Sequence, residues 1–360
     1  MAGKTQSAVV TSTEKMEIQT FDLPDIGEED GLLKVEMCGV CGSDPRIYRW
    51  PQESFPVIMG HEIVGHIADI GSRASARWGV GSGDRVVVEH LFGCGFCRMC
   101  LIGEYRFCEE HPGYGGPVKC TLPPYLWGGY GQYMYLAPNS RVHRISKDLP
   151  AEAAAMTCAN IGNGIRWVRT KGGVSIGDKV VIIGPGGQGL AAVIAAREAG
   201  AELIIVVGLT QDAHRFELAG LFGATDVVDL QKEDPVQKVT DLTKGALADV
   251  VVDLSGATAS APLSLELVRP MGTVVIGSNT GKEEVPLVTG RIVSKEIRYQ
   301  GVNTHDTPAV RTAIKLIESR RYPIEKMVTH HFSLEEAEKA VFAAAGQVHL
   351  DGFIKGAIVP

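Results

Sequence analysis

The chain has 360 residues, of which 45% are hydrophobic and 21% are charged, an ordinary balance for a globular protein of about two domains. A formal net charge of −7 without a lysine- or arginine-rich run argues against nucleic acid or an anionic membrane as the main partner. We expect no signal peptide, because the first twenty residues lack an apolar core flanked by basic residues. No apolar stretch approaches the roughly 18 residues of a membrane span. These features favour a cytoplasmic protein, in which clustered cysteines are more often metal ligands than disulfides.

The N-terminal half is rich in glycine and proline and carries short strand patterns such as "DRVVVEH" and "GQYMYLA". This composition predicts an irregular, β-rich domain.

Two segments of this half hold potential metal ligands. "CGVCGSD" (Cys38–Asp44) is followed by "GHEIVGHIADIGSRA" (Gly60–Ala74). A zinc ion with an open coordination position needs about three protein ligands. Cys41 and His61 supply two, and Glu62 is an additional or alternating ligand. Taken alone, each of the three is also compatible with a purely structural role, as a buried thiol, a satisfied imidazole or an exposed carboxylate.

Two neighbouring residues suit supporting roles at such a site. Asp44 is placed to hold the second ring nitrogen of His61, which would determine the tautomer and the orientation of the ring. Ser43 carries a hydroxyl that can pass on a proton from a zinc-bound hydroxyl group.

A second candidate metal site lies within one loop, "GCGFCRMCLIGEYRFC" (Gly93–Cys108). Its four cysteines are separated by two, two and seven residues: Cys94, Cys97, Cys100 and Cys108. Four thiolates around zinc form a closed tetrahedral site that stabilises its loop and leaves no position for a substrate. An iron–sulfur cluster and two disulfides are the alternatives.

A nucleotide-binding pattern follows in "KVVIIGPGGQGLAAVIAAREAGA" (Lys179–Ala201). A short buried strand at Val180–Ile183 leads into a G-x-G-x-x-G turn, and an alanine-rich helix spans about Gln188–Glu198. The strand before and the helix after make this turn a strong dinucleotide-binding signal, with the phosphates at the helix N-terminus. The predicted cofactor-binding residues of the turn are Gly184, Gly186, Gly187, Gln188 and Gly189.

The rest of the chain alternates apolar strand patterns with helical ones, which predicts a doubly wound parallel sheet. The further strands are expected at Leu203–Val207, Asp226–Val228, Asp249–Leu254, Thr273–Ile276 and about Ile297–Val302. The helices are expected near Asp212–Leu221, Pro235–Thr243, Ala259–Leu267 and Thr307–Glu318. "SLEE" (Ser333–Glu336) is a capping box that begins another helix, and "GFIKGAIV" is a last strand that rejoins the first domain.

With these motifs in this order, the chain resembles, nearly end to end, the zinc-dependent alcohol dehydrogenases of the medium-chain dehydrogenase/reductase superfamily. The resemblance implies an α/β protein with a GroES-like β-rich catalytic domain and a Rossmann domain. Residues 1–160 would form the first part of the catalytic domain, with a structural zinc lobe at 93–108. Residues 161–303 would form the Rossmann domain that binds NAD(P), and residues 304–360 would form the C-terminal part of the catalytic domain. It also implies one catalytic and one structural zinc, and assembly as a homodimer or homotetramer. The activity would be hydride transfer between an alcohol and a nicotinamide cofactor, with the reverse reaction reducing an aldehyde or ketone.

The chain departs from its relatives at two catalytic positions. The third ligand of the catalytic zinc is expected in "AAMTCANIGNGIRWV", where Cys158 is the natural ligand. However, when the neighbouring Gly-Asn pair is aligned with that of polyol and threonine dehydrogenases, the position of their zinc ligand falls on Ala159. We predict Cys158, and otherwise a zinc held by Cys41, His61, Glu62 and water. Many relatives have a histidine where this chain has Arg46, which stays protonated and cannot act as a base. Arg46 would instead contact a cofactor phosphate or an anionic substrate.

The choice between NAD and NADP stays open. An NAD enzyme usually ends its second strand with an acidic residue for the ribose hydroxyls, whereas this chain has Gly208. His214 or Arg215 would attract a 2′-phosphate, but Asp212 could still reach the ribose. Lys355 is a further candidate contact for the pyrophosphate.

Two alternatives to an alcohol dehydrogenase remain. One is a zinc-independent quinone or enoyl reductase of the same superfamily, and the other is a non-catalytic NAD(P)-binding redox sensor. The presence of Cys41, His61 and Glu62 together, with Ser43 beside them, argues against both.

Overall fold

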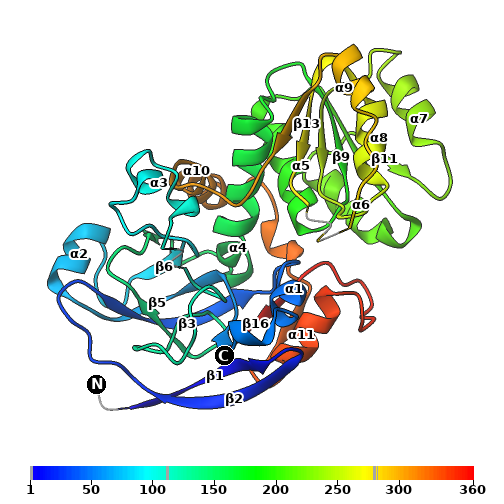
Figure 1. Cartoon of the computed structure of the whole chain (residues 1–360). Coiled ribbons are helices and arrows are strands. Elements are labelled where there is room, and N and C mark those ends of the chain that lie inside the picture. The colour runs from blue at the N-terminus through cyan, green and yellow to red at the C-terminus, as the bar shows by residue number, and fades with distance from the viewer. Residues whose placement is uncertain (1–2, 111–112, 279–280, 282) are drawn as a thin grey trace. The chain divides into compact units, whose positions relative to one another are not determined.

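The computed structural model describes residues 3–110, 113–278, 281 and 283–360 (Figure 1). They form two compact units. The first comprises the described residues up to Ala159 together with Ile317–Ser319 and Ile324–Pro360, and the second comprises Asn160–Leu316 and Arg320–Pro323. Most of helix α10 (Thr307–Glu318) thus groups with the second unit, whereas the sequence analysis assigned this segment to the C-terminal part of the first domain.

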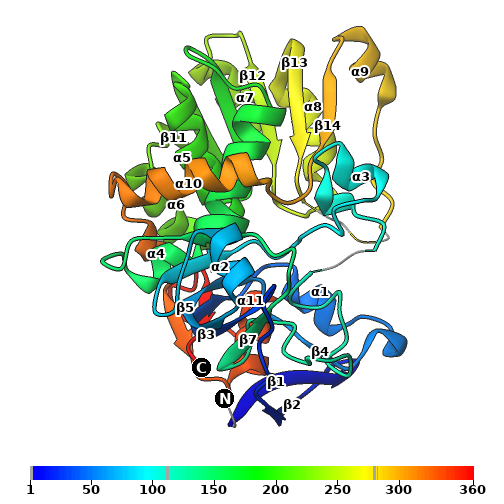
Figure 2. The same ribbon diagram turned by 90° about the vertical axis from the view of Figure 1, so that its left-hand side faces the viewer.

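The second unit is built on a six-stranded parallel sheet (Figure 2). Its strands are β9 (Lys179–Ile183), β10 (Leu203–Gly208), β11 (Asp226–Asp229), β12 (Ala248–Asp253), β13 (Val268–Ile276) and β14 (Arg298–Gly301). Their order across the sheet is β11-β10-β9-β12-β13-β14, and every neighbouring pair is parallel. This is the order of a doubly wound dinucleotide-binding fold, which confirms the fold predicted for this half.

Helices cover this sheet because its central strands β9, β10 and β12 are apolar and buried along most of their length and expose neither face to water. The helices of the second unit are α5 (Gly187–Ala199), α6 (Ala213–Leu221), α7 (Pro235–Leu242), α8 (Ser260–Leu267), α9 (Thr289–Ser294) and α10. Helix α5 packs on β9 and β10, and α8 packs on β12 and β13. The unit also contains the π-helix η4 (Ile165–Lys171) and the 3-10 turn η5 (Thr210–Asp212).

The first unit is β-rich, as predicted, with two antiparallel sheets and one parallel pair at an edge. The smaller sheet has the order β2-β1-β4, and the larger has β15-β16-β3-β5-β6-β8 with β7 paired to β3. The strands are β1 (Lys4–Ser12), β2 (Lys15–Asp22), β3 (Gly31–Gly39), β4 (Val57–Ile58), β5 (Glu62–Ile70), β6 (Arg85–Val88), β7 (Tyr133–Leu136), β8 (Val142–Arg144), β15 (His330–Phe332) and β16 (Gly356–Ile358). Strand β16 pairs with β3, so the C-terminal strand does rejoin the first unit.

Short helices connect these strands. They are α1 (Asp44–Tyr48), η1 (Gln52–Ser54), α2 (Ser72–Trp78), α3 (Arg98–Leu101), η2 (Tyr105–Phe107), α4 (Ala151–Ala155), η3 (Thr157–Gly162), η6 (Ile324–Met327) and α11 (Ala337–Ala344). The "SLEE" segment lies just before α11: Glu336 accepts the Ser333 N–H at 3.3 Å, but the helix itself begins only at Ala337.

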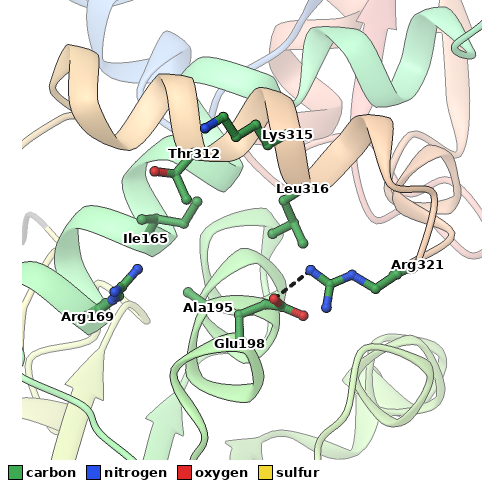
Figure 3. A pocket seen from close by; sticks show the side chains of 8 residues that line it. All are labelled: Ile165, Arg169, Ala195, Glu198, Thr312, Lys315, Leu316 and Arg321. Carbon is green, nitrogen blue, oxygen red and sulfur yellow. Dashed lines mark hydrogen bonds and ion pairs between the residues drawn. The ribbon is translucent and has the colours of Figure 1, made fainter.

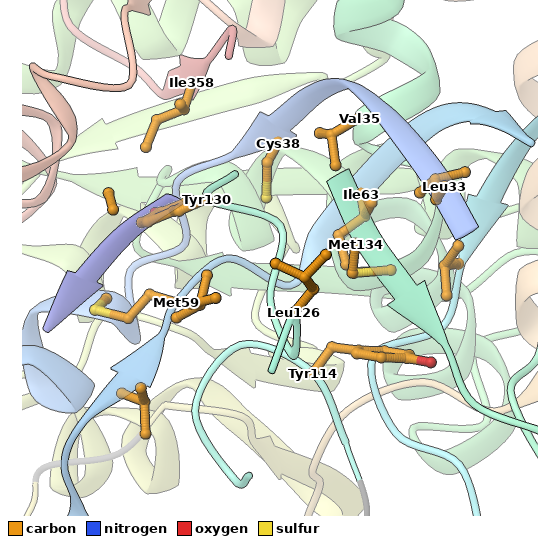
Figure 4. Packing of buried hydrophobic residues seen from close by; sticks show 14 of the residues in the cluster. Leu33, Val35, Cys38, Met59, Ile63, Tyr114, Leu126, Tyr130, Met134 and Ile358 are labelled. Atoms are coloured by element: carbon orange, nitrogen blue, oxygen red, sulfur yellow. The ribbon is translucent and has the colours of Figure 1, made fainter. Parts of the chain in front are cut away.

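The core of the first unit lies between its strands (Figure 4). Tyr130, Met59 and Ile63 are fully buried there, and the thiol of Cys38 points into the same cluster. The described residues include no helix that is both long enough and apolar enough to cross a bilayer.

Candidate metal and nucleotide sites

The four cysteines of the loop at 93–108 converge in the structure. The sulfurs of Cys94 and Cys100 are 3.9 Å apart, as are those of Cys97 and Cys108. Four sulfurs about 2.3 Å from one central zinc would be about 3.8 Å apart, whereas a disulfide requires about 2.05 Å. All four thiols are free, so the disulfide alternative is wrong. Backbone N–H groups, first that of Glu109, lower the pKa of Cys97 to about 6, whereas burial raises the pKa of Cys100 to about 12, so of these two thiols Cys97 ionises first.

A second cluster forms where β3 and β5 pair. Antiparallel pairing sets Gly39, the last residue of β3, opposite Glu62, the first residue of β5. Cys41 follows β3 by two residues and His61 precedes β5, so the pairing brings both side chains to the same end of the two strands. One ligand atom each of Cys41, His61 and Glu62 lies within 4.8 Å of the others. These are the three residues that the sequence indicated for the open zinc site.

Asp44 supports the imidazole of His61. Its Oδ1 lies 3.4 Å from His61 Nδ1, which leaves Nε2 on the side of Ser43 Oγ, also at 3.4 Å. The carboxylate is fully buried and accepts hydrogen bonds from Tyr130 Oη at 2.7 Å and from the Cys41 N–H at 2.8 Å. Sequence reasoning missed Tyr130, since nothing in its local pattern indicates a partner 86 residues away.

The electrostatics of this cluster suit a bound cation. Burial acts to lower the pKa of His61, but the negative charges of Asp44 and Cys41 outweigh it and raise the pKa to about 10. Burial also raises the pKa of Asp44. The protein thus gathers two acidic groups and a thiol in a buried place where positive charge is favoured. Sulfur, nitrogen and carboxylate donors of this kind are those that zinc takes in open sites, so the residues fit the metal.

Lys355 lies at this cluster. It is 6% exposed, and its Nζ is 3.0 Å from Glu62 Oε1, 2.8 Å from Glu62 Oε2 and 2.9 Å from the carbonyl oxygen of Val40. A side chain on Gly39 would overlap Glu62 Oε2, so this glycine makes room for the carboxylate. Lys355 is predicted from the sequence to contact the pyrophosphate, whereas in the structure its ammonium group contacts Glu62 and the Val40 carbonyl.

Cys158 lies in η3, a π-helical turn, and its thiol is buried. Burial raises the pKa of Cys158, and the nearby carboxylates of Glu89 and Glu62 raise it further. Cys158 is not among the described residues whose ligand atoms cluster within 4.8 Å around Cys41. Its neighbour Ala159, which occupies the alternative ligand column, is also buried. The third protein ligand therefore stays a prediction.

Arg46 and His90 lie near the cluster of Cys41, His61 and Glu62. Arg46 is exposed on α1, one turn after Ser43, and no ion pair to it is found among the described residues. The ring of His90 lies 5.2 Å from that of His61, between centroids.

The glycine turn has the geometry that the sequence predicted. Gly184 follows β9 with φ +95°, and a side chain there would lie 2.7 Å from the Cα atom of Ser255. A side chain on Gly189 would overlap the carbonyl oxygen of Gly184, so the third glycine allows helix α5 to approach the turn. Gly186 is the N-cap of α5 without a capping side chain, and a Cβ atom there would meet nothing within 4 Å.

The other predicted cofactor residues lie nearby. Gly187 and Gln188 are the first two residues of α5, and Gln188 Oε1 accepts a hydrogen bond of 3.3 Å from Asn163 Nδ2. Gly208 is the last residue of β10, next to β9 in the sheet, and Arg215 lies in the first turn of α6. The uncapped N–H groups at the start of α5 suit the pyrophosphate of a dinucleotide.

A pocket elsewhere in the second unit encloses about 170 Å³ (Figure 3). Arg169 and Lys315 border it, together with the Arg321–Glu198 ion pair of 2.8 Å. No predicted catalytic, metal or cofactor residue lines this pocket, so it supports none of the predicted roles.

Two family models match this chain. Residues 27–147 match the family model of the alcohol dehydrogenase GroES-like domain, and residues 187–319 match that of zinc-binding dehydrogenases. A Mycobacterium tuberculosis protein named "Probable alcohol dehydrogenase adh" is 40% identical over 349 residues, covering 95% of each chain. An erythritol/L-threitol dehydrogenase of Mycolicibacterium smegmatis is 30% identical, covering 94% of this chain and 93% of its own.

Two solved structures share the whole fold. A protein of Sinorhizobium meliloti 1021 named "putative zinc-binding dehydrogenase", bound to NADP, has a TM-score of 0.87 and 26% identity, covering 99% of this chain and 100% of its own. An alcohol dehydrogenase from Thermotoga maritima has a TM-score of 0.89 and 25% identity, with the same coverage. Similarity over nearly the whole of both chains, with both family models matched, identifies an oxidoreductase that acts on CH–OH groups with zinc and NAD(P). The chain belongs to the zinc-dependent alcohol dehydrogenase family of the medium-chain dehydrogenase/reductase superfamily.

Proposed function

We propose that Cys41 and His61, with Cys158 or Glu62, hold the catalytic zinc of this alcohol dehydrogenase, and that the four-cysteine loop holds a structural zinc. The observation that carries the proposal is the convergence of Cys41, His61 and Glu62 within 4.8 Å, with the Nδ1 side of the histidine held by Asp44. When bound, zinc would supply Lewis acidity to the oxygen of an alcohol, and the nicotinamide would accept the hydride.

The protein's own groups would orient the ring and move the proton. Asp44 keeps His61 Nδ1 engaged, so Nε2 is the nitrogen available to a metal. Ser43 Oγ, 3.4 Å from that nitrogen, is half-buried and would carry the substrate's proton outward. Arg46 stays protonated and would bind a phosphate or an anionic substrate instead of accepting the proton.

The substrate class would be a small alcohol or, in the reverse direction, the matching aldehyde or ketone. The relatives include dehydrogenases named for erythritol or threitol, sorbitol, D-arabitol phosphate and L-threonine. A polyol, a phosphorylated polyol and an amino alcohol therefore belong in any substrate panel, beside simple primary and secondary alcohols. Because Arg46 is exposed, turnover of the phosphorylated polyol tests whether Arg46 binds an anionic substrate.

The test combines metal content with turnover. The wild-type chain should hold about two zinc ions and reduce NAD⁺ or NADP⁺ with at least one alcohol of the panel. Cys41→Ser should lose turnover and about one zinc while its melting temperature changes little. Cys97→Ser should lose about one zinc and melt earlier. No turnover with either cofactor, or equal melting losses in both variants, would contradict the proposal. A zinc-independent reductase or a redox sensor would hold only about one zinc.

A homodimer or homotetramer in a reducing compartment completes the proposal. Strand β14 is an edge of the six-stranded sheet, where unpaired backbone groups can meet another chain. Exposed apolar side chains support an interface on the same unit: Met271, Val288 and Val293 are 73%, 61% and 77% exposed. The free thiols support a reducing compartment. Light scattering of the purified chain distinguishes the oligomers from a monomer.

A further inference from the structure

The end of strand β10 carries no acidic side chain and is tightly packed. In an NAD enzyme a carboxylate at this place binds the ribose hydroxyls. Here the strand ends at Gly208, and a Cβ atom built on it would lie 3.0 Å from the ring of Phe216 and 3.0 Å from Pro185 Cδ. At these distances the Phe216 ring and Pro185 would each have to give way by a few tenths of an ångström. The packing therefore leaves little room for a side chain at this position.

The nearest acidic residue in the following loop does not replace it. Asp212 is 6% exposed. Its Oδ2 accepts the Leu209 N–H at 3.0 Å, and its Oδ1 accepts Arg215 Nη1 at 2.9 Å. Both oxygens thus have partners within the loop. The possibility left open by the sequence, that Asp212 reaches the ribose, would require it to break these bonds.

The neighbouring strand also ends in an acidic residue with internal partners. Asp229 lies opposite Gly208 in the register of β10 and β11. Its Oδ2 accepts a hydrogen bond of 2.7 Å from the Thr210 hydroxyl and lies 3.0 Å from Lys232 Nζ. Burial opposes ionisation of Asp229, but the hydrogen bonds from Thr210 and Lys232 lower its pKa. Its charge is therefore balanced by a cation of the same loop.

The two carboxylates are matched by two cations, so the site is close to neutral and would not repel a phosphate dianion. Arg215 lies in the first turn of α6, where the helix adds partial positive charge, and its side chain is 26% exposed. A guanidinium has five N–H donors in a planar fork, so it can serve Asp212 and a phosphate together. On the basis of the proposed function, we propose that the chain binds NADP(H) in preference to NAD(H) at the end of β10. Arg215 would contact the 2′-phosphate.

The test measures binding without turnover. Isothermal titration of the full chain compares 2′,5′-ADP with 5′-AMP, which differ only in the 2′-phosphate, and titration of NADPH against NADH repeats the comparison with intact cofactors. In each pair, the compound with the 2′-phosphate should bind at least about 10-fold more tightly, because a charge-assisted hydrogen bond contributes a free energy of this size. Arg215→Gln should weaken 2′,5′-ADP about 10- to 100-fold and leave 5′-AMP within about threefold. The exposed Arg311→Gln on α10, which removes the same charge, should change neither.

The outcomes separate the two proposals. If 5′-AMP binds as tightly as 2′,5′-ADP, or if Arg215→Gln leaves 2′,5′-ADP binding unchanged, the NADP preference is overturned while the dehydrogenase function stands. If neither NADPH nor NADH binds, the proposed function fails as well. If Arg215→Gln weakens both probes equally or melts early, Asp212→Asn decides. This variant removes the negative charge beside Arg215, so tighter 2′,5′-ADP binding supports the proposal and unchanged or weaker binding overturns it.

Discussion

The ion pair between Lys355 and Glu62 yields the sharpest stability prediction. The two side chains are 7% and 0% exposed, and the ammonium group lies 2.8 Å from Oε2 of the carboxylate. Replacing Lys355 by methionine keeps most of the apolar stem but leaves the buried carboxylate without its cation. Removing one partner of a buried pair costs about 3–5 kcal/mol, because the remaining charge stays desolvated. For a unit of about 200 residues this corresponds to a melting temperature lowered by roughly 6–20 °C.

The assay is denaturant unfolding of zinc-depleted protein, followed by tryptophan fluorescence. Three of the four tryptophans, Trp50, Trp78 and Trp127, lie in the first unit. The wild type, Lys355→Met, Glu62→Gln and the double variant form a cycle that isolates the coupling between the two side chains. The double variant should recover most of the lost stability, since no buried charge is left unpaired. With zinc bound, the loss in Lys355→Met should shrink, because the metal's charge compensates Glu62.

A matched control is Lys339→Met. Lys339 pairs with Glu336 at 3.1 Å, but both side chains are about half exposed, so water screens the pair and little stability should change. A coupling energy below about 1 kcal/mol between Lys355 and Glu62 would refute the reasoning, since a pair this deeply buried cannot be so weakly coupled if the geometry is right. An equal loss in Lys339→Met would refute it too.

Three further predictions follow from contacts elsewhere. Tyr105→Phe removes the hydroxyl that donates to the fully buried Glu89, and denaturant unfolding should show a loss of about 1–3 kcal/mol; an unchanged midpoint would mean that water replaces the hydroxyl. Gly189→Ala should lower both stability and NAD(P)H affinity, because the added methyl group overlaps the carbonyl oxygen of Gly184. Gly186→Ala should lower affinity alone, because a methyl group there meets nothing in the protein. Thermal melts measure the change in stability, and fluorescence titration measures the change in affinity. Burial acts to raise the pKa of Asp249, but hydrogen bonds from a backbone N–H and an arginine lower it, so its stabilisation is present above the unfolded pKa and is lost as the pH falls. Asp249→Asn should therefore be less stable than wild type at pH 7 and approach it below about pH 4, and parallel acid-unfolding curves would contradict this.

Features contained in one short segment could be predicted from the sequence. The four-cysteine loop places its ligands within fifteen residues, so the spacing alone limits how the thiols can meet. The glycine turn is similar, because the strand, the turn and the helix follow one another along the chain. The ends of the elements were less certain: α11 begins at Ala337, after the capping pattern at Ser333–Glu336, since a capping pattern does not determine where hydrogen bonding starts.

The partners of the site residues could not be predicted in the same way. Lys355 and Glu62 are 293 residues apart, and Tyr130 and Asp44 are 86 apart. The sheet order β16-β3-β5 brings Lys355, just before β16, beside the start of β5. No local pattern in the sequence encodes that order.

The amino-acid sequence by itself determined the donor atoms, the two metal-binding patterns and the nucleotide turn, because each depends on residues close together in the chain. The tertiary structure alone decided which cation each carboxylate contacts. It paired Glu62 with Lys355 and Asp212 with Arg215, and it packed Phe216 and Pro185 against Gly208 at the end of β10. These outcomes depend on burial and on the distances between charges, and both are set only when the strands and helices pack.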